Sequence, residues 1–177
     1  AAAVVAIPPL LQSLGAARFG VLTLIWAIVS FFGVFDLGLG RVLTQRLAVE
    51  LSLPNASRTG AIVATSLLLM LALGSIGGLL LAAAGVAYIH RVPSIPDTAE
   101  AVRSMYAMAV AMPAIIVTSG LRGILEARHA FAAVNMIRVP MGLFTYLGPL
   151  AVAWWYEPSL DAIAWVLAIA RWLACAA

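Results

Sequence analysis

Residues 60–89 read GAIVATSLLLMLALGSIGGLLLAAAGVAYI and carry no charged side chain over their whole length. Only a helix satisfies its own backbone hydrogen bonds inside hydrocarbon, and about 20 apolar residues are enough to cross a bilayer. The stretch therefore predicts a transmembrane helix. The whole chain has the same character, with 64% hydrophobic residues, 10% charged residues and a mean hydropathy of +1.09. This composition excludes a water-soluble domain.

Similar apolar runs lie on both sides of residues 60–89, separated by short polar joints. The length of 177 residues is enough for five or six spans, at about 20 residues per span. We expect an all-α, polytopic membrane bundle that is a piece of a longer chain, with its first and last spans truncated. The expected spans cover residues 1–12, 20–48, 60–89, 98–125, 131–156 and 160–177.

The basic residues predict how the chain lies in the membrane. All ten of them are arginine, and cytoplasmic joints of membrane proteins are enriched in positive charge. One set of joints collects more arginines than the opposite set, and we place it in the cytoplasm. The richer set holds Arg41, Arg46, Arg58, Arg122, Arg128 and Arg138, and the poorer set holds Arg18, Arg91 and Arg103.

Local motifs predict where helices begin and where they touch. Asp97 and Glu100 have the spacing of a capping box, and Ser159 stands where an N-cap is expected. Gly74 and Gly78 form a small-xxx-small pair that favours close contact between membrane helices. Gly38 and Gly40 are expected to allow another helix to approach in the same way.

Asp36 is a carboxylate inside the expected span 20–48. A lone carboxylate in hydrocarbon is costly, so it should face a partner or a wet cavity. The candidate partners are Arg41 on the same span and Arg122 and Arg138 on neighbouring spans, which are expected at similar depth in the cytoplasmic half. Two interpretations remain open for Asp36, a structural ion pair or a part in handling substrate or protons.

Arg171 stands apart from the other arginines because of its depth. It lies about 18 Å from the start of the expected span 160–177 at ~1.5 Å per residue, which is near the midplane. An arginine at this depth does not easily reach water and indicates a functional site. The alternative is a structural pair with Asp36 or another acid.

The sequence predicts neither an enzyme nor a metal site. It contains one cysteine, Cys175, and no cluster of His, Cys and acidic residues has the spacing of metal ligands. No nucleophile elbow or phosphate loop is present, so we expect no catalytic residue and no cofactor. The net charge of +3 is too small to indicate nucleic acid binding.

Two stretches carry a resemblance to a known family. Residues 14–20 (LGAARFG) and 36–40 (DLGLG) form the first, and residues 123–131 (GILEARHAF) with Arg138 and Pro140 form the second. They resemble the bacterial oligosaccharide and polysaccharide flippases of the multidrug/oligosaccharidyl-lipid/polysaccharide exporter superfamily. The resemblance implies a pair of six-helix lobes with twelve to fourteen spans in all, of which this chain would be most of the N-terminal lobe.

The resemblance also implies a function. Such a protein moves an undecaprenyl-diphosphate-linked oligosaccharide from the cytoplasmic to the outer leaflet of the cell inner membrane, for assembly of cell-surface polysaccharide. Its partners would be membrane lipids and the polymerase or ligase that uses the glycan. Arginine forks bind phosphate oxygens, so the expected substrate path holds Arg41, Arg122, Arg138, Arg171 and Asp36.

Other functions are compatible with the same residues. A peptidoglycan-precursor flippase would carry a chemically similar substrate. A drug or cation antiporter of the same superfamily would need carboxylates inside the membrane, where arginine outnumbers acid. A non-transporting scaffold or inactive fragment would need no arginine at the midplane. A membrane glycosyltransferase would need an acidic metal-binding loop, which we do not find.

Overall fold

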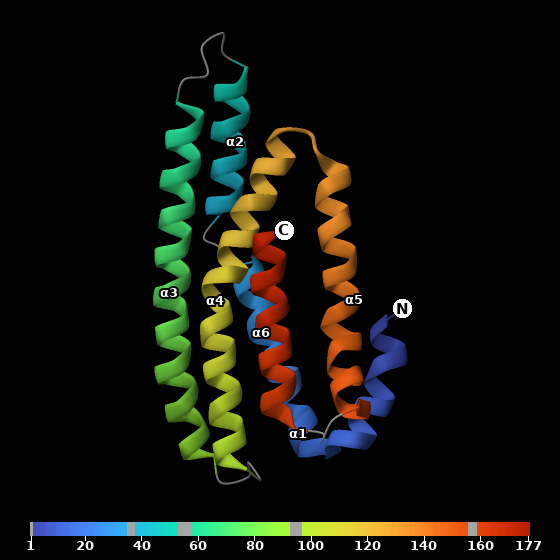
Figure 1. Ribbon diagram of the computed structural model, residues 1–177. Coiled ribbons are helices and arrows are strands. Elements are labelled where there is room, and N and C mark those ends of the chain that lie inside the picture. The colour runs from blue at the N-terminus through green and yellow to red at the C-terminus, as the bar shows by residue number, and fades with distance from the viewer. Residues whose placement is uncertain (1, 35–37, 53–57, 93–96, 156–158) are drawn as a thin grey trace.

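The computed structural model describes residues 2–34, 38–52, 58–92, 97–155 and 159–177. These residues form an all-helical bundle, as the sequence predicts (Figure 1). No strand occurs within the described ranges. The helices are α1 (Ala2–Val34), α2 (Leu39–Leu51), α3 (Thr59–Arg91), α4 (Thr98–Ala127), α5 (Phe131–Trp155) and α6 (Leu160–Ala176).

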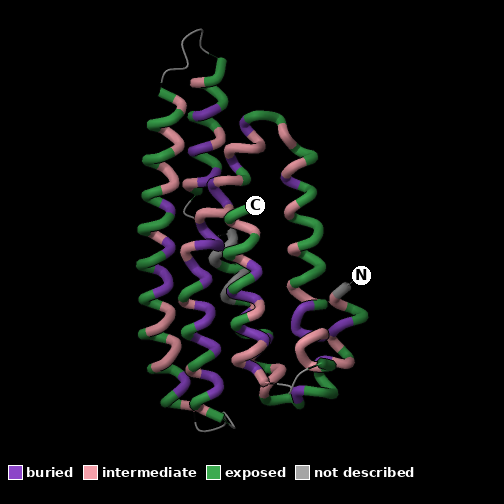
Figure 2. The backbone as a smooth tube through the Cα atoms, viewed as in Figure 1, coloured by how far each residue is buried: buried purple, intermediate pink, exposed green. Residues whose placement is uncertain are grey.

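Four stretches of these helices are long and apolar enough to cross a membrane: Ala3–Ala27 within α1, and the whole of α3, α4 and α5. Large apolar side chains such as Leu68, Leu79 and Trp155 are exposed. Figure 2 shows exposed positions along the outer helices of the bundle. An apolar exterior is stable in lipid and costly in water. The chain is therefore built as a helical membrane protein.

Helix α4 is the centre of the bundle and packs against each of the other five helices. Small and flexible side chains fill this position, among them Ala107, Met108, Ala111 and Met112, all of which are buried. Short side chains let neighbouring backbones come close, and methionine fits irregular gaps between helices. Figure 2 shows the resulting run of buried residues along α4.

Helices α3 and α4 touch backbone to backbone at the predicted glycine pair. A Cβ atom added at Gly74 would lie 2.6 Å from Pro113 Cα, and one added at Gly78 would lie 2.4 Å from Ala109 O. No real Cβ tolerates these distances, so only glycine permits the crossing. The predicted contact role of Gly74 and Gly78 is confirmed.

The expected span 20–48 is not one continuous helix. Helix α1 ends at Val34 and α2 begins at Leu39 after Gly38, whose backbone is left-handed with φ 74°. Glycine adopts this conformation without the steric cost that other residues meet. Helix α2 then packs against α3 and α4, where Gly40 comes close to Gly123, as expected of a small residue.

A second interruption lies inside α1, within the joint predicted between the first two spans. Gly15 has φ 76° and ψ 163°, which is not helical, and the helix axis changes direction there. Figure 1 shows the N-terminal part of α1 beside α5 and the following part behind α6. This kink places Arg18 at the same end of the bundle as the first turn of α4.

The start of α4 has the predicted cap. Asp97 stands at the N-cap, and its Oδ1 accepts a hydrogen bond from the Glu100 backbone N–H at 2.9 Å. Ser159 stands at the N-cap of α6, but its side chain makes no capping hydrogen bond. The first N–H of α6, that of Leu160, instead donates to Glu100 Oε1.

We expect Asp97→Ala to lower the free energy of unfolding by about 1 kcal/mol, because the capped N–H loses its acceptor. Ser159→Ala is the matched control and should change the stability by less than about 0.5 kcal/mol. Reversible unfolding in detergent micelles, followed by circular dichroism, measures both. Equal effects of the two substitutions would contradict the capping geometry.

Candidate functional site

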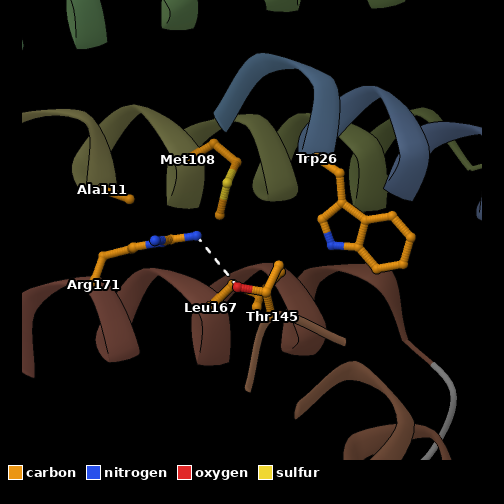
Figure 3. Close-up of a pocket in the computed structure, with 6 residues that line it drawn as sticks. All are labelled: Trp26, Met108, Ala111, Thr145, Leu167 and Arg171. Atoms are coloured by element: carbon orange, nitrogen blue, oxygen red, sulfur yellow. Dashed lines mark hydrogen bonds between the residues drawn. The ribbon is translucent and has the colours of Figure 1, made fainter. Parts of the chain in front are cut away.

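Arg171 lies in the interior of the bundle, at a point where four helices meet. It belongs to α6, and its guanidinium extends toward α5 and α4 (Figure 3). The side chain is half-buried. Its surroundings form a cavity whose other lining residues come from α1, α4, α5 and α6: Trp26, Met108, Ala111, Thr145 and Leu167.

The hydrogen bond of Arg171 goes to a hydroxyl group. Its Nη2 donates to Thr145 Oγ1 over 3.4 Å, a long distance for such a bond. The Thr145 hydroxyl donates its own hydrogen to Met141 O at 2.8 Å, so it serves Arg171 only as an acceptor. A hydrogen bond to a neutral oxygen stabilises a guanidinium much less than a hydrogen bond to a carboxylate does.

Among the described residues, the acidic side chains near the bundle interior are paired with other arginines. Arg18 Nε contacts Glu100 Oε2 at 3.0 Å, and Arg103 Nε contacts Asp161 Oδ2 at 2.8 Å. Within the described ranges, Arg171 therefore forms no ion pair. The alternative that Arg171 pairs with another acid therefore finds no support among the described residues. Asp36, the other proposed partner of Arg171, lies outside the described residues.

The cavity is narrow. Its volume is about 10 Å³, which is the space of about one water molecule. Apart from Arg171, Thr145 and Trp26, its lining residues are the apolar Met108, Ala111 and Leu167. This cavity has room for a single atom of a ligand, not for a diphosphate or a sugar.

Trp26 is a member of this site that the sequence analysis did not single out. Its ring stacks edge-on against Phe19 and Tyr146, with centroid distances of 6.3 and 5.2 Å. These contacts hold the indole in place between α1 and α5. No motif marks Trp26 in the sequence, because its role depends on helices that meet only in the folded bundle.

The other predicted path residues lie on different helices. Arg41, Arg122 and Arg138 are exposed on α2, α4 and α5, and Arg122 contacts Glu126 on its own helix at 3.4 Å. Among the described residues neither Arg41 nor Arg138 forms an ion pair. The proposed grouping of these three arginines thus remains a prediction, and Asp36 lies outside the described residues.

At the end of the bundle where α4 and α6 begin, Glu100 joins three helices. It is 4% exposed, and its carboxylate contacts both Arg18 of α1 and the backbone of α6. The sequence analysis assigned Glu100 to the cap of α4 alone. Its two contacts with distant segments are visible only in the tertiary structure. Because they hold α1 and α6 against α4, we assign Glu100 a structural role.

The fold and the site together define a class of protein: a helical membrane bundle with an arginine held in its interior. In the part of the chain that the structure describes, no group of three metal-ligating side chains occurs. We compared the chain with protein-family models, curated proteins and solved structures, and none of the three comparisons found a match.

Proposed function

We propose that this chain is part of a flippase that moves a lipid-linked oligosaccharide from the cytoplasmic to the outer leaflet of the cell inner membrane. The carrier lipid would be a polyprenyl diphosphate such as undecaprenyl diphosphate. The observation that carries the proposal is Arg171, a half-buried guanidinium that contacts a hydroxyl and, within the described ranges, no carboxylate. An intramembrane cation of this kind favours an anionic substrate.

The chemistry of the substrate fits this charge. A diphosphate is the anionic part of the carrier lipid, and guanidinium groups bind phosphate oxygens through paired N–H donors. Arg41, Arg122 and Arg138 would meet the diphosphate from the cytoplasmic side, and Arg171 would hold it deeper. The glycan would cross in the larger space between two lobes.

The break between α1 and α2 supports a transport role. Interrupted helices at membrane depth are tolerated where they are buried in protein or line a wet cavity, and they mark binding sites in many transporters. Figure 1 shows α2 running beside the upper part of α3. The left-handed backbone of Gly38 lies directly before the start of α2. A bundle that served only as a scaffold would not require an interrupted helix.

A cation or drug antiporter is less well supported. It requires carboxylates that are available to a cation, whereas Glu100 and Asp161 are each paired with an arginine. A peptidoglycan-precursor flippase shares the diphosphate and is distinguished by the sugar that the assay follows.

The test uses the full-length protein in cells that depend on it for the surface glycan. Arg171→Ala and Arg138→Ala are each expected to slow the appearance of the lipid-linked glycan in the outer leaflet by about tenfold or more. This corresponds to the loss of a charge-assisted hydrogen bond of about 1.5–3 kcal/mol. Arg91→Ala, an exposed arginine at the end of α3, is the control and should leave the rate unchanged.

Membrane levels of each variant are measured alongside the transport rate. Unchanged flipping at normal levels in both the Arg138 and the Arg171 variants would overturn the arginine path. If only the peptidoglycan precursor accumulates on the inner leaflet of the variants, the substrate is that precursor.

A further inference from the structure

Three arginines at the end of the bundle that the arginine distribution predicts to be cytoplasmic are not part of the proposed substrate path. They are Arg46 on α2, Arg58 at the N-cap of α3 and Arg128 at the C-cap of α4. All three are exposed, and within the described ranges none of their side chains forms an ion pair. At the opposite end, Arg18 and Arg103 are each paired with an acid.

Contacts between the helices place these three arginines at a common height. Gly40 of α2 lies against Gly123 of α4, and the side chain of Leu67 of α3 lies against Gly120 of α4. Counted from these contacts at ~1.5 Å per residue, each of the three arginines lies about 7–9 Å beyond Gly123 along the bundle. Figure 1 shows the corresponding parts of α2, α3 and α4 side by side.

The uncharged part of α4 marks where the hydrocarbon ends. No charged residue occurs between Arg103 and Arg122, and this interval is about 28 Å long at ~1.5 Å per residue. The hydrocarbon core of a bilayer is about 30 Å thick, and each head-group layer adds roughly 5–8 Å. Gly123 therefore lies at the edge of the hydrocarbon, and the three arginines lie at the level of the lipid head groups.

The outer face of α2 has the character of an interfacial surface. Leu43 and Leu47 are buried on the side that faces the bundle. On the other side Val42 and Val49 are 48% and 64% exposed, and Arg46 lies about one helical turn from each of them. Exposed valines beside an arginine suit the boundary between acyl chains and head groups, where the apolar carbons avoid water and the guanidinium reaches phosphate.

The glutamates of α2 and of the last turn of α4 do not neutralise the three arginines. Glu50 Oε1 accepts a hydrogen bond from the backbone N–H of Arg58 at 3.0 Å, not from its guanidinium. Glu126 contacts Arg122 on its own helix. The three guanidiniums are thus available to an anion in the head-group layer.

We propose that Arg46, Arg58 and Arg128 bind the phosphates of anionic phospholipids, such as phosphatidylglycerol, in the leaflet at this end of the bundle. Guanidinium groups bind phosphate oxygens through paired N–H donors. Each arginine near the surface adds to the attraction for anionic lipid, so three of them at one height favour it more than a lone one does. Phosphatidylcholine carries no net charge and is attracted much less.

The test uses the full-length protein in phosphatidylcholine nanodiscs that hold a small fraction of a phospholipid with a photoactivatable group on its head group. The labelled lipid is phosphatidylglycerol in one arm and phosphatidylcholine in the other. After irradiation, chymotryptic peptides are analysed by mass spectrometry. We expect peptides from residues 42–58 and 122–131 to carry at least about fivefold more crosslinks in the anionic arm.

A variant with Arg46→Gln, Arg58→Gln and Arg128→Gln together should lose this excess, because the neutral side chains no longer attract the anion. Lysine at the same three positions should retain most of it, since the charge remains. Arg91→Gln, at the opposite end of α3, is the control and should leave the crosslinks of these peptides unchanged. The contact of Glu50 is kept in all variants, because it uses the backbone N–H of Arg58.

Sodium chloride at 1 M should also reduce the excess, since the Debye length falls to about 3 Å. Equal crosslinking of these peptides by the two labelled lipids would overturn the inference and leave the three arginines exposed to water alone. An excess that persists in the triple glutamine variant would overturn it as well, because the anionic lipid would then be held by other residues.

Discussion

Glu100→Ala is expected to lower the free energy of unfolding by about 1–3 kcal/mol, the usual cost of leaving a buried hydrogen-bond donor without its acceptor. The Glu100 side chain is nearly inaccessible, and its two oxygens serve two helices besides its own. Oε2 accepts from Arg18 Nε at 3.0 Å, and Oε1 accepts from the Leu160 N–H. The substitution removes the acceptor of the buried Leu160 N–H and the carboxylate that pairs with Arg18.

The position of Glu100 adds to this effect. It lies in the first turn of α4 and contacts the first residue of α6, so its negative charge stands at two helix N-termini. The partial positive charge of the helix dipole favours an anion at each of these ends. Glu100→Gln keeps an acceptor for the Leu160 N–H and loses the charge, so it should cost less than the alanine substitution.

The matched control is Glu126→Ala on the same helix. Glu126 contacts Arg122 at 3.4 Å, but both side chains are more than a third exposed, and such surface pairs contribute about 0–1 kcal/mol. Unfolding with sodium dodecyl sulfate in mixed micelles compares the variants. If Glu100→Ala and Glu126→Ala destabilise the protein equally, Glu100 does not join the three helices as described.

Gly78→Ala is expected to lower the free energy of unfolding by about 1–3 kcal/mol, the range for added methyl groups in a tightly packed interior. The new Cβ would lie 2.4 Å from the carbonyl oxygen of Ala109, which belongs to the backbone of α4 and has no rotamer to change. The α3–α4 crossing must therefore open. Gly78→Leu should separate the two helices further and reduce the yield of folded protein.

Gly60→Ala in the same helix is the control. A Cβ at Gly60 meets nothing within 4 Å, so no clash accompanies the substitution. Alanine favours helix over glycine by up to about 1 kcal/mol, and the control should be neutral or slightly stabilising. The same unfolding assay distinguishes the two. A Gly78→Ala variant as stable as the Gly60→Ala variant would rule out the close crossing.

The helices themselves could be predicted from the sequence, because hydropathy and turn residues act over short distances. The charge-free run at 60–89 lies within α3, and the later polar joints fall between helices, whereas the first predicted joint lies inside α1 at the Gly15 kink. Asp97 caps α4 because a capping box spans only four residues. The glycines at positions 74 and 78 indicate a contact face in the same local way. The break before Leu39 was not predicted, since the apolar pattern continues through it.

The tertiary structure determines which side chains meet. Glu100 reaches Arg18 and Leu160, which lie 82 and 60 positions away along the chain, and Arg171 reaches Thr145, which lies 26 positions away. Depth in the membrane marks Arg171 in the sequence, but its neighbours Thr145 and Trp26 follow from how α1, α5 and α6 cross. Hydropathy along the chain is enough to predict that it forms apolar membrane helices, and the positions of the charges follow directly from the residues. The crossing of those helices decided the partners of each charge, because contacts between distant segments depend on packing that no local pattern encodes.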